Sequence, residues 1–527
     1  MQAKSGRRRA RTTRSRTGCR TCRARRIKCD ETPGRCQNCK AAGWPCEGSD
    51  LTRLPGKATY GAQHATLLSS VAAQFPWPIT SDEKRCLSFL WHHLIPDSVV
   101  VSGVSDLFSP RNLIGQLSVV EPAVYHALVA LSAINHQVHE AGIAIPGQSL
   151  RSKWQHFALE QSLRAFTLLK HRPASQDPRL RQVILVCCLL FVLIELASAR
   201  YDDANAHLQA GLKILNEEAP SSLPIDPTLS DAFLYLESHS AFHGVHQPFR
   251  ELEAQFARLE TFEIQLRPFR SVEHARQTLN PLVPPIFRLL ERCWSLSETD
   301  LARQYGVLQP KQQRLLSCLT QVNTYFDDLL TTYPHFTDRE RRSADVVQLS
   351  LLTFTLSLKA CLHAPWDPAL HPLRPEFEDL MAKTVALNAK LGTRPQFTPD
   401  GILCAALSFL ALRCPDYRIR LQAIAALQAF PRAEGYYNGL VVAEFAISGL
   451  KLELTQSMSD RTVEKLLGLQ QDEHLLGSIA TLQGASDWLS NQAGGQVQTE
   501  CSDVGGHQVW YLNTSNPRRV PWEEGDK

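Results

Sequence analysis

The chain has 527 residues, of which 44% are hydrophobic and 20% charged, so it can form more than one domain and a large core. Its net charge of +4 conceals an asymmetry, because residues 1–28 contain twelve Lys and Arg and no acid, whereas residues 29–527 carry a net charge of −8. A basic arm on an otherwise acidic protein indicates a local contact with nucleic acid and argues against a generally cationic surface.

Two features argue against export and against a membrane span. No apolar stretch follows the N-terminal arginines, as a secretory signal requires. The longest apolar run, residues 183–194, has twelve residues, whereas a transmembrane helix needs roughly 20. We therefore expect a soluble, intracellular protein that has no membrane partner and buries this run as a helix.

The chain begins with an arm, residues 1–17, whose basic, polar run at residues 7–16 offers no core-forming side chain. We expect the arm to be disordered. Its arginines fit a nuclear-import signal or a contact along the DNA backbone, and a solvated run of charge is the plain alternative. These arginines are Arg7, Arg8, Arg9, Arg11, Arg14 and Arg16.

Six of the fifteen cysteines follow the arm with a regular spacing. They are Cys19, Cys22, Cys29, Cys36, Cys39 and Cys46. One unit, C-x2-C-x6-C, is repeated after seventeen residues. A disulfide framework is an alternative, but nothing in the sequence indicates export, and separate reactive thiols would not need such regularity. The spacing therefore predicts a metal site.

Zinc is the metal that the cysteine pattern favours, because it is redox-inert and suits closed thiolate sites. Two four-coordinate ions need eight ligand positions, which six thiolates fill only when two of them bridge. The internal repeat makes equivalent cysteines the natural bridges. We expect two Zn²⁺ per chain.

The stretch GCRTCRARRIKCDETPGRCQNCKAAGWPC resembles the fungal binuclear zinc-cluster transcription factors over about residues 16–48. The resemblance implies a DNA-binding domain at residues 18–48, and it implies that the first and fourth cysteines, here Cys19 and Cys36, bridge the two ions. It also implies a nuclear protein that binds double-stranded DNA.

The two halves of the repeat differ in charge. The first contains Arg20, Arg23, Arg25, Arg26 and Lys28, whereas the second contains only Lys40 between its outer cysteines. In the family the first helix enters the major groove. Arg25 and Arg26 resemble the base-reading pair, although the family often has lysine in place of Arg26, and arginine suits guanine. We expect Arg20, Arg23 and Lys28 to contact phosphates. The resemblance implies CGG-type half-sites.

Two glycines mark turns in the cysteine module. Thr32-Pro33-Gly34 fits a type II turn that joins the halves, and Gly43 is expected to end the second short helix. Neither turn needs a role in DNA binding.

A linker is predicted at residues 49–79, which are rich in Gly, Pro, Ser and Thr. Pro55 and Pro76 limit any helix there, and the apolar positions of a coiled coil are not sustained over three heptads. We therefore expect residues 1–79 to be monomeric, so that any dimer forms through the rest of the chain.

The remainder, residues 80–527, is predicted to be all-α, which makes the protein mainly helical. Thr80 and Glu83 form a capping-box signature before an apolar run that stops at Pro96, and Ser109-Pro110 opens another helix. Further helices are expected at 121–142, 178–201 and 202–217 and at about 228–243, 310–331, 340–363, 375–390, 401–413, 417–429 and 437–453. Strand-like alternation is almost absent before the C-terminal HQVWYLNT.

The helical segments EPAVYHALVALSAI, YDDANAHLQAGLKIL and RIRLQAIAALQAF resemble the fungal-specific transcription factor regulatory domain. Together with the zinc module, this implies a sequence-specific regulator of RNA polymerase II transcription, with metabolic or secondary-metabolite genes as targets. It implies contacts with transcription machinery or co-regulators and leaves room for a small-molecule effector.

The alternative function is an enzyme with an all-α catalytic domain that the zinc module tethers to DNA. No P-loop, G-x-S-x-G or H-E-x-x-H motif is present, so we predict no enzymatic activity. The histidines His92, His93, His136 and His139 and the pair Cys187-Cys188 fit helix surfaces or a core better than ligands or redox centres. An RNA-binding module would need aromatic stacking that the cysteine module lacks.

Overall fold

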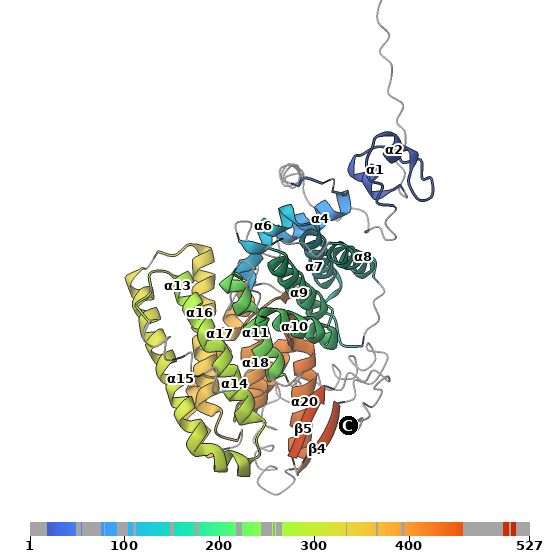
Figure 1. The fold of residues 1–527 in the computed structure, drawn as a ribbon. Coiled ribbons are helices and arrows are strands. Elements are labelled where there is room, and N and C mark those ends of the chain that lie inside the picture. The colour runs from blue at the N-terminus through green and yellow to red at the C-terminus, as the bar shows by residue number, and fades with distance from the viewer. Residues whose placement is uncertain are drawn as a thin grey trace, which may run out of the picture.

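The computed structural model shows a small six-cysteine module at one end of a much larger helical body (Figure 1). It describes residues 18–48, 54, 75–77, 79–91, 104–108, 112–147, 152–172, 177, 179–217, 224–243, 256, 259, 266–333, 335–364, 367–391, 396–456, 499–504 and 507–512. The arginines of the basic arm and almost all of the predicted linker lie outside these residues, as does the helix start predicted at Ser109-Pro110.

The six-cysteine module contains two short helices, α1 (Arg20–Ala24) and α2 (Gln37–Ala41). Five of its cysteines form a buried cluster of their own, separate from the core of the body, and Cys46 packs against them. Because two five-residue helices bury almost no aliphatic side chain, the cysteines themselves are the core of the module.

The first half of the body is a set of packed helices. They are α4 (Ser81–Phe89), η2 (Ser105–Phe108), α6 (Leu113–Val120), α7 (Pro122–Ala141), α8 (Lys153–Lys170), α9 (Leu180–Ala197), α10 (Tyr201–Asn216) and α11 (Pro227–Phe242). Helix α7 is central, because it packs against α4, α6, α8 and α9. Helices α9 and α10 pack against each other, and only three residues join them.

The second half continues in the same way and closes the same continuous core. It contains α13 (Val272–Leu279), η3 (Asn280–Leu282), α14 (Val283–Trp294), α15 (Glu298–Thr332), α16 (Asp338–Ala360), η4 (Pro368–Leu373), α17 (Arg374–Leu391), α18 (Leu403–Arg413), α19 (Tyr417–Ala429) and α20 (Gly439–Gln456). The mainly helical class predicted from the sequence is confirmed.

Two small sheets accompany the helices. In the first, β1 (Gln396–Thr398) pairs in parallel with β2 (Arg432–Glu434), which pairs antiparallel with β3 (Tyr437–Asn438). The second is a hairpin of β4 (Thr499–Val504) and β5 (His507–Leu512), in the segment where the sequence showed alternation. The three-stranded sheet was not predicted, because strands of two or three residues are too short to show a period of two.

The apolar run at residues 183–194 lies in α9. Among the described residues, α9 is the single helix long and apolar enough to cross a membrane by length and composition, and α6 with α7 would pass only as a pair bent by 118°. Because 67% of α9 is buried within the body, it matches the expected core helix.

The prediction for α15 was wrong at its start, which lies at Glu298 and not at residue 310. Ser297 is the N-cap and accepts a hydrogen bond from the Asp300 N–H, while Pro310 lies inside the helix. The predicted range began at about residue 310, and proline is favoured in the first turn of a helix. Helices α8, α13 and α14 were not predicted at all.

Candidate zinc centre and nucleic-acid interface

Each helix of the six-cysteine module begins at a cysteine that caps it. The Cys19 Sγ accepts a hydrogen bond from the Cys22 N–H at 3.3 Å, and the Cys36 Sγ accepts one from the Cys39 N–H at 3.4 Å. The first and fourth cysteines therefore occupy the same place in their halves, where an N-cap oxygen would otherwise stand.

The third and sixth cysteines return to the same point in each half. The Cys29 Sγ accepts a hydrogen bond from the Cys19 N–H at 3.3 Å, and the Cys46 Sγ accepts one from the Cys36 N–H at 3.4 Å. The seventeen-residue repeat in the sequence is thus a repeat in the structure, which brings all six sulfurs to the centre of the module.

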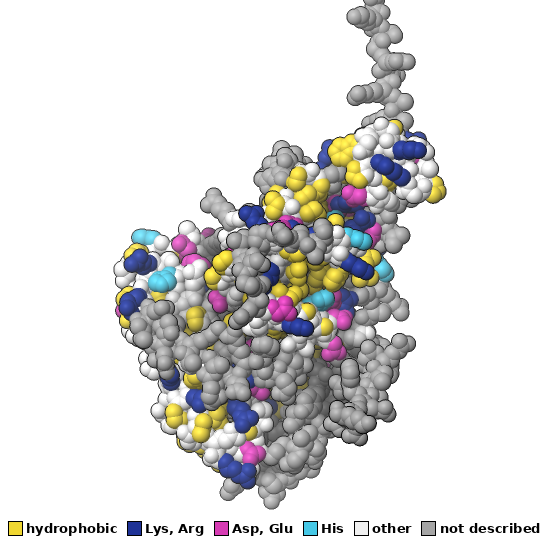
Figure 2. Space-filling view, in the orientation of Figure 1, with side chains coloured by type: hydrophobic (Ala, Val, Ile, Leu, Met, Phe, Trp, Pro, Cys, Tyr) yellow, Lys and Arg dark blue, Asp and Glu magenta, His cyan; other side chains and the backbone are white. Residues whose placement is uncertain are grey.

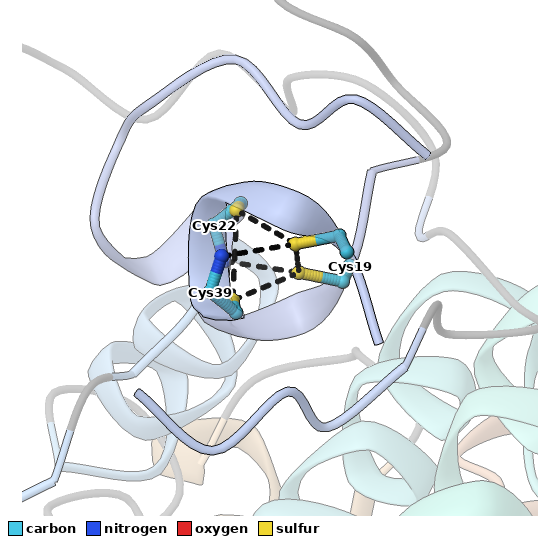
Figure 3. A group of neighbouring side chains, drawn as sticks. Cys19, Cys22 and Cys39 are labelled. Carbon is cyan, nitrogen blue, oxygen red and sulfur yellow. Dashed lines mark hydrogen bonds between the residues drawn. The ribbon is translucent and has the colours of Figure 1, made fainter. Parts of the chain in front are cut away.

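Four sulfurs lie at the separations that a tetrahedral metal site requires. The Sγ of Cys19 is 3.6 Å from that of Cys36 and 3.7 Å from that of Cys39, and the Sγ of Cys22 is 3.6 Å and 3.8 Å from the same two (Figure 3). Ligands at a Zn–S distance of about 2.3 Å from one ion stand about 3.8 Å apart. The thiols therefore fit zinc, and Cys29 and Cys46 stand beside the group.

Burial raises the pKa of Cys19 and Cys36, and hydrogen bonds with the Cys22 and Cys39 thiols raise it further at both. Packing thiols this closely disfavours the thiolate unless a cation enters, because a second negative charge would lie within 4 Å. The donor set thus suits a divalent metal that binds thiolates and displaces their protons.

Both helices end with the same hydrogen-bond motif. In the first half the Ile27 N–H donates to the Cys22 carbonyl, and the residue between helix and return is Arg26, with φ of 59°. In the second half the Trp44 N–H donates to the Cys39 carbonyl, and the equivalent residue is Gly43, with φ of 70°. The prediction that Gly43 ends α2 is confirmed, and Arg26 holds a backbone that normally selects glycine.

Asp30 is a structural residue that the sequence interpretation missed. Its carboxylate accepts hydrogen bonds from the Gln37 N–H at 2.9 Å and the Asn38 N–H at 3.1 Å, so it joins the end of the first half to the start of α2. Hydrogen bonds from the Thr32 hydroxyl and then from the Gln37 N–H hold the pKa of Asp30 below its usual range. The loop between Asp30 and α2 turns at Gly34, which has φ of 78°.

The basic residues of the first half divide into two groups. Arg26 and Lys28 are exposed beyond the end of α1, together with Ile27, and Arg25 is half-buried with its guanidinium 5.2 Å from the centre of the Trp44 ring. Figure 2 shows Lys and Arg side chains on the visible face of the six-cysteine module. These residues stay predicted DNA contacts.

Arg20 and Arg23 point instead toward the helical body. Arg20 is 3% exposed and pairs with Glu83 and Glu47, while the Arg23 Nη2 lies 3.3 Å from the Asp82 Oδ2. The Arg20 guanidinium is enclosed by two carboxylates in this arrangement, and its contact with phosphate stays a prediction. The carboxylates are remote from Arg20 and Arg23 in sequence, so no local sequence pattern could predict these ion pairs.

The other predicted candidates lie where a core would place them. The His136 ring stacks on Trp154 with centroids 3.9 Å apart, and burial lowers the pKa of His136 to about 4. Cys187 is buried and Cys188 half-buried, and burial raises the pKa of Cys188 to about 11. His92 and His93 lie outside the described residues.

The chain matches two protein families. Residues 17–54 match the family described as fungal Zn(2)-Cys(6) binuclear cluster domain, and residues 102–406 match the fungal specific transcription factor domain. The first match covers all six cysteines, and the second covers more than half of the chain and much of the helical body.

Three relatives that match parts of the chain are named as regulators. The aspercryptin biosynthesis cluster-specific transcription regulator atnN of Emericella nidulans is 24% identical over 394 residues, which is 67% of this chain and 60% of that protein. The transcription regulator lscL of Purpureocillium lilacinum is 22% identical over 42% of this chain and 52% of its own length. White-opaque regulator 2 of Candida albicans is 56% identical over 43 residues, 8% of this chain and 10% of that protein. No solved structure matches the chain.

Proposed function

Because the chain belongs to the fungal-specific transcription factors with a Zn(2)-Cys(6) binuclear cluster domain, we propose that it regulates RNA polymerase II genes by reading CGG-type half-sites. As a transcription regulator with this domain it binds two zinc ions per chain. The finer assignments below rest on the geometry of the six-cysteine module.

The six cysteines would hold the two ions, with Cys19 and Cys36 shared between them. The equivalent positions of these two thiols in the repeat support this assignment, because a shared ligand must reach both ions. Zinc here supplies structure, since each ion ties cysteines of both halves together. Cys19→Ser should therefore disturb both zinc ions, whereas Cys22→Ser should release one. Metal analysis of the two variants checks this, and one zinc in the wild-type chain would contradict the shared cluster.

The observation that carries the DNA assignment is the exposed edge formed by Arg26, Ile27 and Lys28 at the end of α1. A short helix with basic residues at its end can enter the major groove, and arginine donates two hydrogen bonds to guanine. The equivalent corner of the second half has Gly43, which has no side chain to offer. Only one half of the repeat is therefore equipped to read bases.

Selection of bound sequences from random DNA by the full chain tests this assignment. Enrichment of a CGG triplet is expected, and Arg26→Ala should weaken binding to that site by roughly 1–3 kcal/mol and relax the base preference. Lys40→Ala is the matched control, because Lys40 is exposed on the other half. A flat profile for the wild-type chain, or equal losses in both variants, would contradict the assignment.

The targets that we propose are genes of secondary metabolism, because one relative is named as specific for the aspercryptin biosynthesis cluster. We further propose that the chain acts in the nucleus, that arginines of residues 7–16 serve import or contact the DNA backbone, and that the helical body receives co-regulators or a small-molecule effector. A fluorescent fusion that stays nuclear after all six arginines become alanine would contradict the import role. In the described residues no observation favours the enzyme alternative.

A further inference from the structure

The helix that faces DNA in the proposed function also touches the helical body. The Arg20 Nε and Nη2 donate hydrogen bonds to the Glu83 Oε1 at 3.0 Å and 2.6 Å, and the Arg23 Nη2 donates to the Asp82 Oδ2 at 3.3 Å. Both acids lie in the first turn of α4, the first described helix of the body. Figure 2 shows acidic side chains where the module meets the body.

This contact is enclosed and its acid is held in place. Glu83 is 0% exposed, and its second oxygen accepts a hydrogen bond from the Thr80 N–H at 2.7 Å within a capping box. Burial disfavours the Glu83 carboxylate, but the charges of Arg20 and then His126 hold its pKa below the usual value. Because Arg20 and Glu83 belong to different parts of the chain, separating the module from α4 would break a buried ion pair.

We propose that this contact is autoinhibitory: the acidic turn of α4 competes with the DNA backbone for Arg20 and Arg23. The inference rests on the proposed DNA binding. In a major-groove complex the flanks of α1 meet phosphates, and Asp82 and Glu83 would repel them. The module thus reads DNA after leaving α4, and whatever holds or releases α4 in the helical body sets the DNA affinity.

DNA affinity of full-length variants tests the competition. Asp82→Asn removes one pair, and Glu83→Gln keeps the capping box because glutamine also caps from this position. The double variant should bind CGG-containing DNA about fivefold more tightly, since the apparent affinity rises with the fraction of open chains. Glu340→Gln is the matched control, because Glu340 occupies the same place in the capping box of α16. An unchanged affinity in the double variant would overturn the inference.

Amide hydrogen exchange separates release from a general effect of charge on DNA binding. Asp82→Arg should increase exchange in α4 without DNA, and Arg23→Glu together with Asp82→Arg should restore protection. CGG-containing DNA should increase α4 exchange in the wild type. Binding with unchanged α4 exchange would overturn this inference alone, whereas failure of the wild-type chain to bind any DNA would overturn the proposed function with it.

Discussion

Replacing Arg26 by glycine should strengthen the fold of the zinc module while removing its DNA readout. Arg26 has φ of 59° at the position where the second half of the repeat has Gly43. The hydrogen bonds around it are intact, with the Arg26 N–H at 3.1 Å from the Arg23 carbonyl and the Ile27 N–H at 3.0 Å from the Cys22 carbonyl. The backbone motif therefore needs the left-handed conformation, and the side chain has no part in it.

The magnitude follows from two opposing effects. A left-handed backbone costs an L-residue roughly 1–2 kcal/mol, which glycine avoids. Glycine in turn loses about 0.5–1 kcal/mol more conformational entropy on folding than a residue with a side chain. The net stabilisation by Arg26→Gly is thus about 0.5–1 kcal/mol. Since a small thiolate module folds as it binds metal, this appears as roughly two- to fivefold tighter zinc binding.

Competition between the full-length chain and a zinc chelator measures this difference. Gly43→Arg is the reciprocal change and should weaken zinc binding by a similar factor, while Arg26→Gly should lose roughly 1–3 kcal/mol of binding to the selected DNA site. Lys40→Gly, within a helix, should weaken zinc binding. If Arg26→Gly also weakens zinc binding, the left-handed backbone of Arg26 does not strain the module, and the Arg26 side chain supports the fold.

Three further predictions concern the helical body. Gly211→Ala would place a Cβ 2.2 Å from the Phe233 ring and should destabilise the fold by about 1–3 kcal/mol. Gly306→Ala would meet nothing within 4 Å of its Cβ and should stabilise the fold by about 1 kcal/mol. Urea unfolding of the two variants measures the difference. Ala199 follows α9 with φ of 54°, so Ala199→Gly should raise the unfolding temperature slightly. Burial raises the pKa of Glu434 to about 7 from its ordinary 4.5, so the native state binds this proton more tightly than the unfolded chain. Stability should fall as pH rises between these values, and unfolding curves of Glu434→Gln should show a weaker fall.

Local signals in the sequence located most helices of the body. Helix α19 has the predicted bounds, and the predicted capping box of Thr80 and Glu83 opens α4. Errors arose where one residue type has two uses. Pro310 lies inside α15, whereas the prolines of η3 and of α14, which was not predicted, lie in the first turns of these helices, where a missing N–H costs nothing.

At the site, too, local sequence signals predicted some features and missed others. The spacing of six cysteines predicted a metal centre because each half is closed by short-range contacts. The ion pair of Arg20 with Glu83 spans 63 residues, so no local rule could assign it. The left-handed backbone of Arg26 had an available signal, since Gly43 stands seventeen residues later in the repeat.

The repeat also indicates which features of the module serve DNA binding and which serve the fold. Features present in both halves, such as the capping thiols and the helix-end motif, are what the metal core requires. Two features occur in the first half only. They are the left-handed backbone conformation of Arg26, where the second half has glycine, and the ion pairs of Arg20 and Arg23 with α4. Neither feature is needed to close the cysteine cluster. A residue kept against its backbone preference points to a role outside the fold. The asymmetry therefore supports the proposal that DNA readout and its control by α4 belong to the first half.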